Sequence, residues 1–460
     1  MNNDRQKQMI LNDNLWQVMF KLSWPAVIAM VLYGLNAVFD AIFVGRFVGE
    51  TALAGVSLAY PLSQLFLGAG SLIGVGAGSA LSIALGADDL DTQTKLLGNV
   101  NYLNLVFGVV FTVSGLVFVT PLVTMMGGSG AELAFGVDYL TIALYGSFFW
   151  IAGLSGNMIV RAEGKMGSAA VMMAIGLLVN IAANYILIVI FDFGVKGAAW
   201  GTNIGMLVYT LLFMIYAGKN KTSFEARLFS IRRDRHIIKA IMSMGIPSFI
   251  MSVMSLIQGI VVLNALSRYG TTADVAFYGI VFRIYTLMLT PVFGLMRALQ
   301  PAIGINFGAA KYDRVIRSFK IFGVAAALLM APFWLAMMAF PQLVLNMMLP
   351  AKEFLTSDVA NFRIFMLLLP ALPLIFMAMT FFPAINNGKP ASIMGISRQL
   401  VFYVPVMLTL PRFFGVHWVY WGSFLIDLVV TIWVFIMVTS EFKKLKKREI
   451  RNLETNTANA

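Results

Sequence analysis

Cysteine is absent from the 460-residue sequence, and charged residues make up only 12% of it. The missing thiols exclude disulfides, a cysteine nucleophile and a cysteine-ligated metal. The two histidines, His236 and His417, have no second histidine or carboxylate at ligand spacing, so we expect no metal and no cofactor. The N-terminal stretch also lacks the short apolar core and small-residue cleavage site of a removable signal peptide.

Hydrophobic residues dominate instead, at 59% of the chain with a mean hydropathy of +0.83. Soluble domains carry about 25% charged residues, so these values indicate a polytopic membrane protein. Windows of about 20 residues, the length that crosses the hydrocarbon as a helix, predict twelve spans. Helices are expected because the runs are apolar on every face. The predicted spans are 16–44, 52–85, 96–120, 134–160, 168–191, 197–217, 238–267, 273–307, 317–341, 359–386, 391–411 and 416–439.

The basic residues predict the orientation of these spans. With the N-terminus in the cytoplasm, the inner loops and span ends hold 25 of the 33 Lys and Arg residues. This asymmetry fits a twelve-span chain with both termini in the cytoplasm. The net charge of +12 therefore fits contact with anionic headgroups of the bilayer and not nucleic-acid binding.

The chain repeats itself at an offset of 222 residues. SWPAVIAM at 23–30 aligns with GIPSFIMS at 245–252, and ALGADDLD at 84–91 aligns with NFGAAKYD at 306–313. We therefore predict an all-α membrane protein of two pseudo-symmetric six-helix bundles, related as parallel repeats. The expected divisions are an N-lobe at 1–217, a cytoplasmic linker at 218–237, a C-lobe at 238–441 and a basic tail at 442–460.

Two lobes of like orientation favour a transporter over a membrane scaffold or a channel. A scaffold has little need for a buried acid, and a channel usually distributes its polar residues along one pore. A membrane-embedded acyltransferase or protease needs a His/Asp, Ser/Lys or metal constellation within the spans, and the sequence has none. We expect no enzymatic activity.

Acidic residues within the membrane are costly and tend to be functional. Asp40 and Asp427 fall inside predicted spans, and Asp138 lies near an outer end. Asn36 and Tyr33 are four and seven residues before Asp40, so the three form a polar stripe on one helix face.

Counting residues from the outer span ends places further polar side chains at the depth of Asp40. Asp40, Tyr139, Asn184 and Thr202 all come out roughly 7–12 Å below the outer edge, with Asn180 one turn deeper. Carboxylate, amide, hydroxyl and phenol oxygens suit a proton or Na⁺ site. The alternative is that the Asn and Thr side chains only join neighbouring helices. Arg283 and Arg297 also share a helix face, where they either contact an anionic group or satisfy helix-end carbonyls.

Several ordered motifs resemble the multidrug and toxic compound extrusion (MATE) family over nearly the whole chain. They are the Pro25–x14–Asp40–x4–Gly45 pattern, GVGAGSALSIALGADD at 74–89, RAEGKM at 161–166 and NIAANYILIVIFDFGVKGAAWGT at 180–202. The resemblance implies a V-shaped cleft open to the periplasm. It also implies export of cationic or amphipathic drugs and organic cations in exchange for H⁺ or Na⁺, by a protein we expect to be a monomer.

The resemblance carries a cation site onto Asp40, Tyr139, Asn180, Asn184 and Thr202, and a helix-bending proline onto Pro25. Many members have aspartate at the position of Asn184, so this chain has one carboxylate there and not two, which weakens Na⁺ binding and favours protonation of Asp40. Asn36, Tyr33, Arg283 and Arg297 remain possible substrate or anion contacts. The alternative within transport is a flippase for lipid-linked oligosaccharides of the same superfamily.

Overall fold

The computed structural model describes residues 2–348 and 354–458, and its regular elements there are all helical, which confirms the predicted all-α fold. The first half of the chain contains α1 (Asn2–Asn12), α2 (Leu15–Phe47), α3 (Glu50–Gly86), α4 (Leu90–Met125), α5 (Gly130–Tyr145), α6 (Ser147–Ala162), α7 (Met166–Asn184), the π-helical segment η1 (Tyr185–Ile190) and α8 (Gly194–Gly218). The second half contains α9 (Arg235–Tyr269), α10 (Thr272–Gly308), α11 (Tyr312–Ala339), α12 (Pro341–Met348), α13 (Thr356–Met366), α14 (Leu372–Ala384), α15 (Gly388–Ile396), the π-helical segment η2 (Ser397–Tyr403), α16 (Val404–Phe414) and α17 (Trp418–Ala458).

Ten helices in the described ranges are long and apolar enough to cross a membrane, and the bent pair α5 and α6 brings the total to 11. The pair meets at Gly146 with an angle of 57°. The predicted span 359–386 is also broken, because α13 and α14 are separated by residues 367–371. Adding the repeat offset of 222 to 146 gives 368, so both breaks occupy the same place in the repeat.

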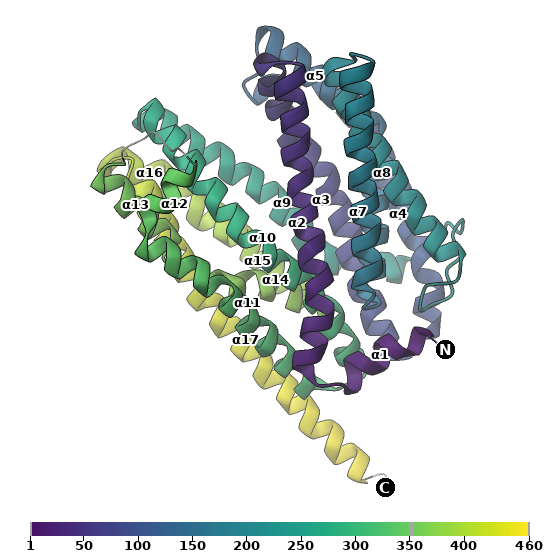
Figure 1. Cartoon of the computed structure of the whole chain (residues 1–460). Helices are drawn as coiled ribbons and strands as arrows, with labels where there is room; N and C mark the ends of the chain where they lie inside the picture. The colour runs from purple at the N-terminus through teal and green to yellow at the C-terminus, as the bar shows by residue number, and fades with distance from the viewer. Residues whose placement is uncertain (1, 349–353, 459–460) are drawn as a thin grey trace.

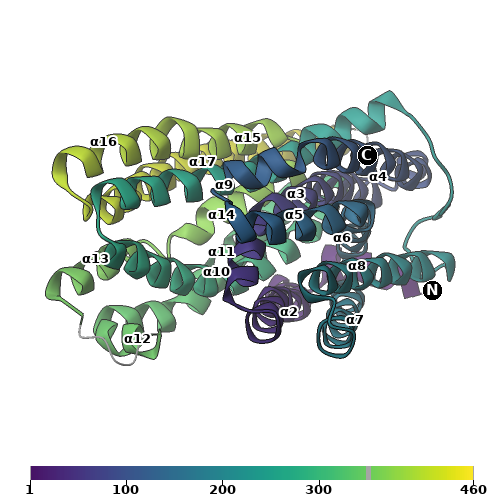
Figure 2. The ribbon, with the colours of Figure 1, turned by 90° about the horizontal axis from the view of Figure 1, so that it is seen from above.

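The helices of the two halves form two groups that lie together at one end and diverge toward the other (Figure 1). Seen from above, the two groups lie next to each other (Figure 2). One hydrophobic core extends across both groups, from Ile10 and Leu22 in the first half to Leu445 in the second. A second core, which includes Val44, Leu140 and Ala199, belongs to the first half alone. Both ends of the chain lie toward the side where the groups join (Figure 1).

Small residues bring α3 and α9 into backbone contact at the centre of the molecule. A Cβ atom on Gly76 would overlap the carbonyl of Ile241, and one on Gly245 would overlap the carbonyl of Leu72. The glycines therefore permit a close crossing that larger side chains would prevent. This crossing joins the two halves.

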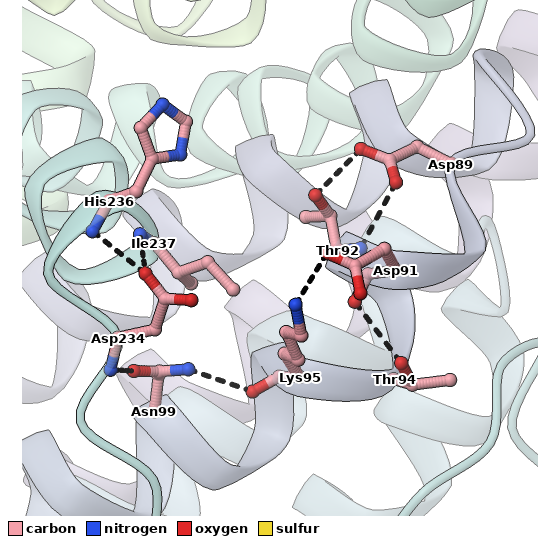
Figure 3. A network of polar contacts seen from close by, with 9 residues as sticks. All are labelled: Asp89, Asp91, Thr92, Thr94, Lys95, Asn99, Asp234, His236 and Ile237. Atoms are coloured by element: carbon pink, nitrogen blue, oxygen red, sulfur yellow. Dashed lines mark hydrogen bonds and ion pairs between the residues drawn. The ribbon is translucent and has the colours of Figure 1, made fainter.

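The connection between the halves is fixed to α4. Asn101 Nδ2 donates to the carbonyls of Leu228 (2.6 Å) and Ser230 (3.0 Å). Figure 3 shows the end of this connection, where the Asp234 N–H donates to Asn99 Oδ1 and the Asp234 carboxylate caps α9. The segment predicted as a linker, which connects α8 to α9 along the chain, thus packs against α4 of the first half. The predicted basic tail continues α17 as far as Ala458.

Candidate functional site

Asp40 lies on α2, partly buried, and accepts hydrogen bonds from two amides. Asn184 Nδ2 donates to Asp40 Oδ1 at 2.6 Å, and Asn36 Nδ2 donates to Asp40 Oδ2 at 3.3 Å. Across the described residues Asp40 forms no salt bridge, whereas the other two acids singled out from the sequence do: Asp427 with Arg398 (2.8 Å) and Asp138 with Lys196 (3.5 Å). Of these three acids, Asp40 is therefore the one whose negative charge is not neutralised by a basic side chain when it is ionised.

Asn180 adds a third amide donor to Asp40. In the amide orientation that satisfies its neighbours, Asn180 nitrogen donates to Asp40 Oδ1 at 3.2 Å and to Asn36 Oδ1 at 3.0 Å. Its oxygen then accepts from the Thr202 N–H at 3.2 Å. Three amide groups thus point donors at one carboxylate, which stabilises its ionised form.

Thr202 and Tyr139 complete the set predicted from the sequence. Thr202 Oγ1 donates to the Ala198 carbonyl at 3.0 Å, as hydroxyls commonly do within helices. The buried phenol of Tyr139 lies close enough to Thr202 and Asp40 to interact electrostatically with both. The structure therefore brings the five predicted residues together from α2, α5, α7 and α8.

Two glycines of α8 allow α7 to place its asparagines beside Asp40. A Cβ atom on Gly201 would overlap Asn184 Oδ1 and lie 3.1 Å from the backbone nitrogen of Asn184. On Gly205 it would lie 2.8 Å from the Asn180 Cβ atom. Gly197, Gly201 and Gly205 recur every four residues, a pattern that lets helices pack closely in membranes. This spacing is the signal in the sequence that predicts the α7–α8 contact.

Two cavities adjoin the Asp40 site. The smaller, of about 60 Å³, is lined by residues that include Asn36, Asn180 and Thr202. The larger, of about 300 Å³, lies between the two halves. Tyr33 borders both cavities, and its hydroxyl donates to Gln64 Oε1 at 3.4 Å. The larger cavity therefore lies next to the smaller one, which borders the polar cluster.

The remaining predicted residues do not join this cluster. Pro25 lies within α2, which continues as one helix through it. Arg297 lines the larger cavity, but Arg283 is exposed and lines none of the described cavities, so the two do not form one site. Arg161 and Arg398, counted from the sequence at the inner face, are both largely buried, and Arg161 lines the same cavity as Arg297. Sequence reasoning gave Arg161 no place in a site.

Comparison with known proteins places the chain in one family. The MatE family model matches residues 25–186 and 247–409, two segments that begin 222 residues apart. The multidrug export protein MepA of Staphylococcus haemolyticus is 27% identical over 95% of this chain and 96% of its own length. The crystal structure of a MATE protein in the bent conformation superposes with a TM-score of 0.90 at 25% identity, covering 97% of this chain and 99% of that one. The outward-facing conformation of a multidrug resistance MATE transporter has a TM-score of 0.88 at 24% identity, over 95% of this chain and 98% of that one.

Proposed function

Because this chain belongs to the MatE family, a family of transport proteins and not of enzymes, we propose that it exports several cationic or amphipathic drugs in exchange for H⁺. The similarity to a protein named for multidrug export extends over nearly the full length of both chains, which supports the drug-export part. The cavity between the two halves offers about 300 Å³ for a substrate.

The observation that carries proton coupling is the set of amide donors around Asp40. Asn36, Asn180 and Asn184 donate to a carboxylate that has no basic partner in the described residues. A Na⁺ ion needs oxygen ligands, so binding it would require these amides to turn their oxygens inward. A proton requires less change, because the O–H of a protonated carboxyl donates one hydrogen bond, which a single amide that turns its oxygen inward can accept. We therefore favour H⁺ over Na⁺.

The transport cycle follows from protonation and deprotonation of Asp40. Protonation of Asp40 from the outer side removes its charge and releases the amides that donate to it. A bend of α2 near Pro25 then narrows the space beside the site, and the drug leaves outward. On the inner side Asp40 loses its proton, and drug binding is favoured again. A potential of 100 mV contributes about 2.3 kcal/mol per elementary charge, roughly a fifty-fold gradient for one net charge moved.

The proposed setting is the bacterial inner membrane, with both termini in the cytoplasm and a single chain as the transporting unit. The basic residues of the ends support this orientation, because they would meet anionic cytoplasmic headgroups. The divergence of the two helix groups would then face outward (Figure 1).

Efflux of ethidium from proteoliposomes, with H⁺ and Na⁺ gradients imposed separately, tests the proposal. We expect a proton gradient to drive efflux in the native protein and to fail in Asp40→Asn. Asp138→Asn is the matched control, since it removes an exposed acid that pairs with Lys196. Full gradient-driven efflux by Asp40→Asn would rule out the mechanism.

A further inference from the structure

The larger cavity contains two arginines and no acid. Its wall includes Arg161 from α6 and Arg297 from α10, and neither Asp nor Glu is among the lining residues. Cationic substrates alone do not explain this charge. Two guanidinium groups facing one space repel each other, and burying them is costly unless an anion neutralises them.

Arg161 is 3% exposed, and one nitrogen of its guanidinium group has no hydrogen-bond acceptor in the described residues. Its Nε donates to Asn157 Oδ1 at 2.7 Å, while its Nη2 is buried without a partner in the described residues. The nearby acid does not compensate it, because Glu163 pairs with Lys165 at 2.9 Å and accepts from the Ser223 N–H. An unsatisfied buried guanidinium donor is costly, so an acceptor is expected there.

Arg297 reaches the same cavity from the other half of the molecule. The hydrogen bond found for its side chain in the described ranges is a weak one, from Nη1 to the Met158 sulfur at 3.9 Å. Tyr209, whose buried hydroxyl also has no partner, is near enough to interact electrostatically with both arginines. Arg161 of α6 and Arg297 of α10 therefore bring donors to the larger cavity, while Tyr209 of α8 lines the adjoining smaller one.

The rest of the wall suits an amphipathic molecule. Four methionines line the cavity, and methionine adapts to ligands of varied shape. Serine hydroxyls line the side that α9 contributes. The methionines are Met30, Met158, Met173 and Met251, and the α9 serines are Ser248, Ser252 and Ser255.

We propose that Arg161 and Arg297 form a binding site for the anionic end, carboxylate or phosphate, of an amphipathic ligand. Guanidinium groups bind these anions with paired hydrogen bonds, and the methionines accommodate the apolar body. This inference rests on the proposed function, because it takes the cavity to be the place where exported molecules bind. It extends the substrate class from cations to amphipaths that carry an acid.

A matched pair of fluorescent probes tests the site. The full chain in phosphatidylcholine nanodiscs is titrated with 7-(diethylamino)coumarin-3-carboxylate and with its ethyl ester, which lacks the charge. We expect the acid to bind at least tenfold more tightly than the ester. Arg161→Gln and Arg297→Gln should each remove most of that preference while ester binding persists, which shows that the variants remain folded.

Arg283→Gln is the control, because it removes a positive charge from the same helix as Arg297 outside the cavity. Arg297→Lys keeps the charge and should retain part of the preference. If added phosphatidylglycerol displaces the acid, the natural anion is a lipid headgroup, as a flippase requires; if it does not, the anion is a soluble solute. Both results support an anion site.

Equal binding of acid and ester by the native protein, or a preference unchanged in both glutamine variants, would overturn the inference. Ethidium efflux measured in the same preparations separates the two proposals. If that efflux still depends on Asp40 while the acid preference is absent, the anion site alone is wrong.

Discussion

Replacing Gly201 with alanine tests whether transport depends on the placement of Asn184. The new methyl group would overlap Asn184 Oδ1, an approach that real Cβ atoms essentially never show, and it would lie 3.0 Å from the Asn184 Cγ atom. The side chain is the part that can move, so its amide rotates and its nitrogen withdraws from Asp40, to which it now donates at 2.6 Å. A hydrogen bond to a charged group contributes about 1.5–3 kcal/mol, which corresponds to roughly a 10- to 150-fold effect.

We therefore expect ethidium efflux by Gly201→Ala to fall at least tenfold, with a loss of stability of about 1–3 kcal/mol from overpacking. Efflux is followed in proteoliposomes and stability by thermal unfolding. Gly167→Ala, which meets nothing within 4 Å, is the control. The double variant Gly201→Ala/Asn184→Ala should regain stability but not efflux, because removing the amide relieves the overlap. Native efflux by Gly201→Ala would refute the reasoning.

Three further substitutions probe other groups. Asn184→Asp places a second carboxylate beside Asp40, and because a cation relieves their repulsion, efflux should become stimulated by a Na⁺ gradient at fixed pH. Arg398→Ala leaves Asp427 buried without its partner, so thermal unfolding should show a loss of about 3–5 kcal/mol. Asp89→Ala removes the cap of α4 and should cost about 1 kcal/mol at pH 7. Hydrogen bonds from Thr92 lower the pKa of Asp89 in the folded protein. The stabilisation by this cap is therefore complete above the unfolded pKa of about 3.9 and is lost as pH falls through the lower folded pKa. The unfolding curves of Asp89→Ala and of the native protein should converge in acid.

Each of these has an outcome that contradicts it. Efflux by Asn184→Asp that ignores Na⁺ would show that a second acid does not create a sodium site. An unchanged melting temperature in Arg398→Ala would mean that the ion pair with Asp427 does not stabilise the fold; Arg412→Ala, on an exposed residue, is the control. A difference between Asp89→Ala and the native protein that persists in acid would assign the effect to something other than the ionised cap.

The sequence predicts the fold well because its strongest patterns extend over many residues. The lengths of the apolar runs, from the one in α2 to the one in the first part of α17, are set by membrane thickness, and a repeat of 222 residues fixes the pairing of the halves. The breaks at Gly146 and at 367–371 escaped prediction, since hydropathy averages over a bend. The contact of α3 with α9 depends on single glycines whose meaning appears only once their neighbours are known.

Depth counting grouped Asp40 with Asn184 and Thr202 because position along a helix fixes depth directly. Depth counting gives neither the rotation of a helix about its axis nor the direction of a hydrogen bond. The sequence therefore could not show that the amides present their nitrogens, and not their oxygens, to the Asp40 carboxylate. Arg161 was missed for a related reason. It lies at the end of a span, where arginines usually reach the headgroups, and its burial follows from the packing of α6 against α3 and α8.

The most direct test of proton exchange at Asp40 is to record lumenal pH while a drug moves. Proteoliposomes with a trapped pH-sensitive dye and no imposed gradient receive ethidium from outside. As ethidium enters, the native protein should move protons out, so the lumenal pH rises, and Asp40→Asn should give no rise. Ethidium accumulation by the native protein without a pH change, or an undiminished rise with Asp40→Asn, would contradict the account.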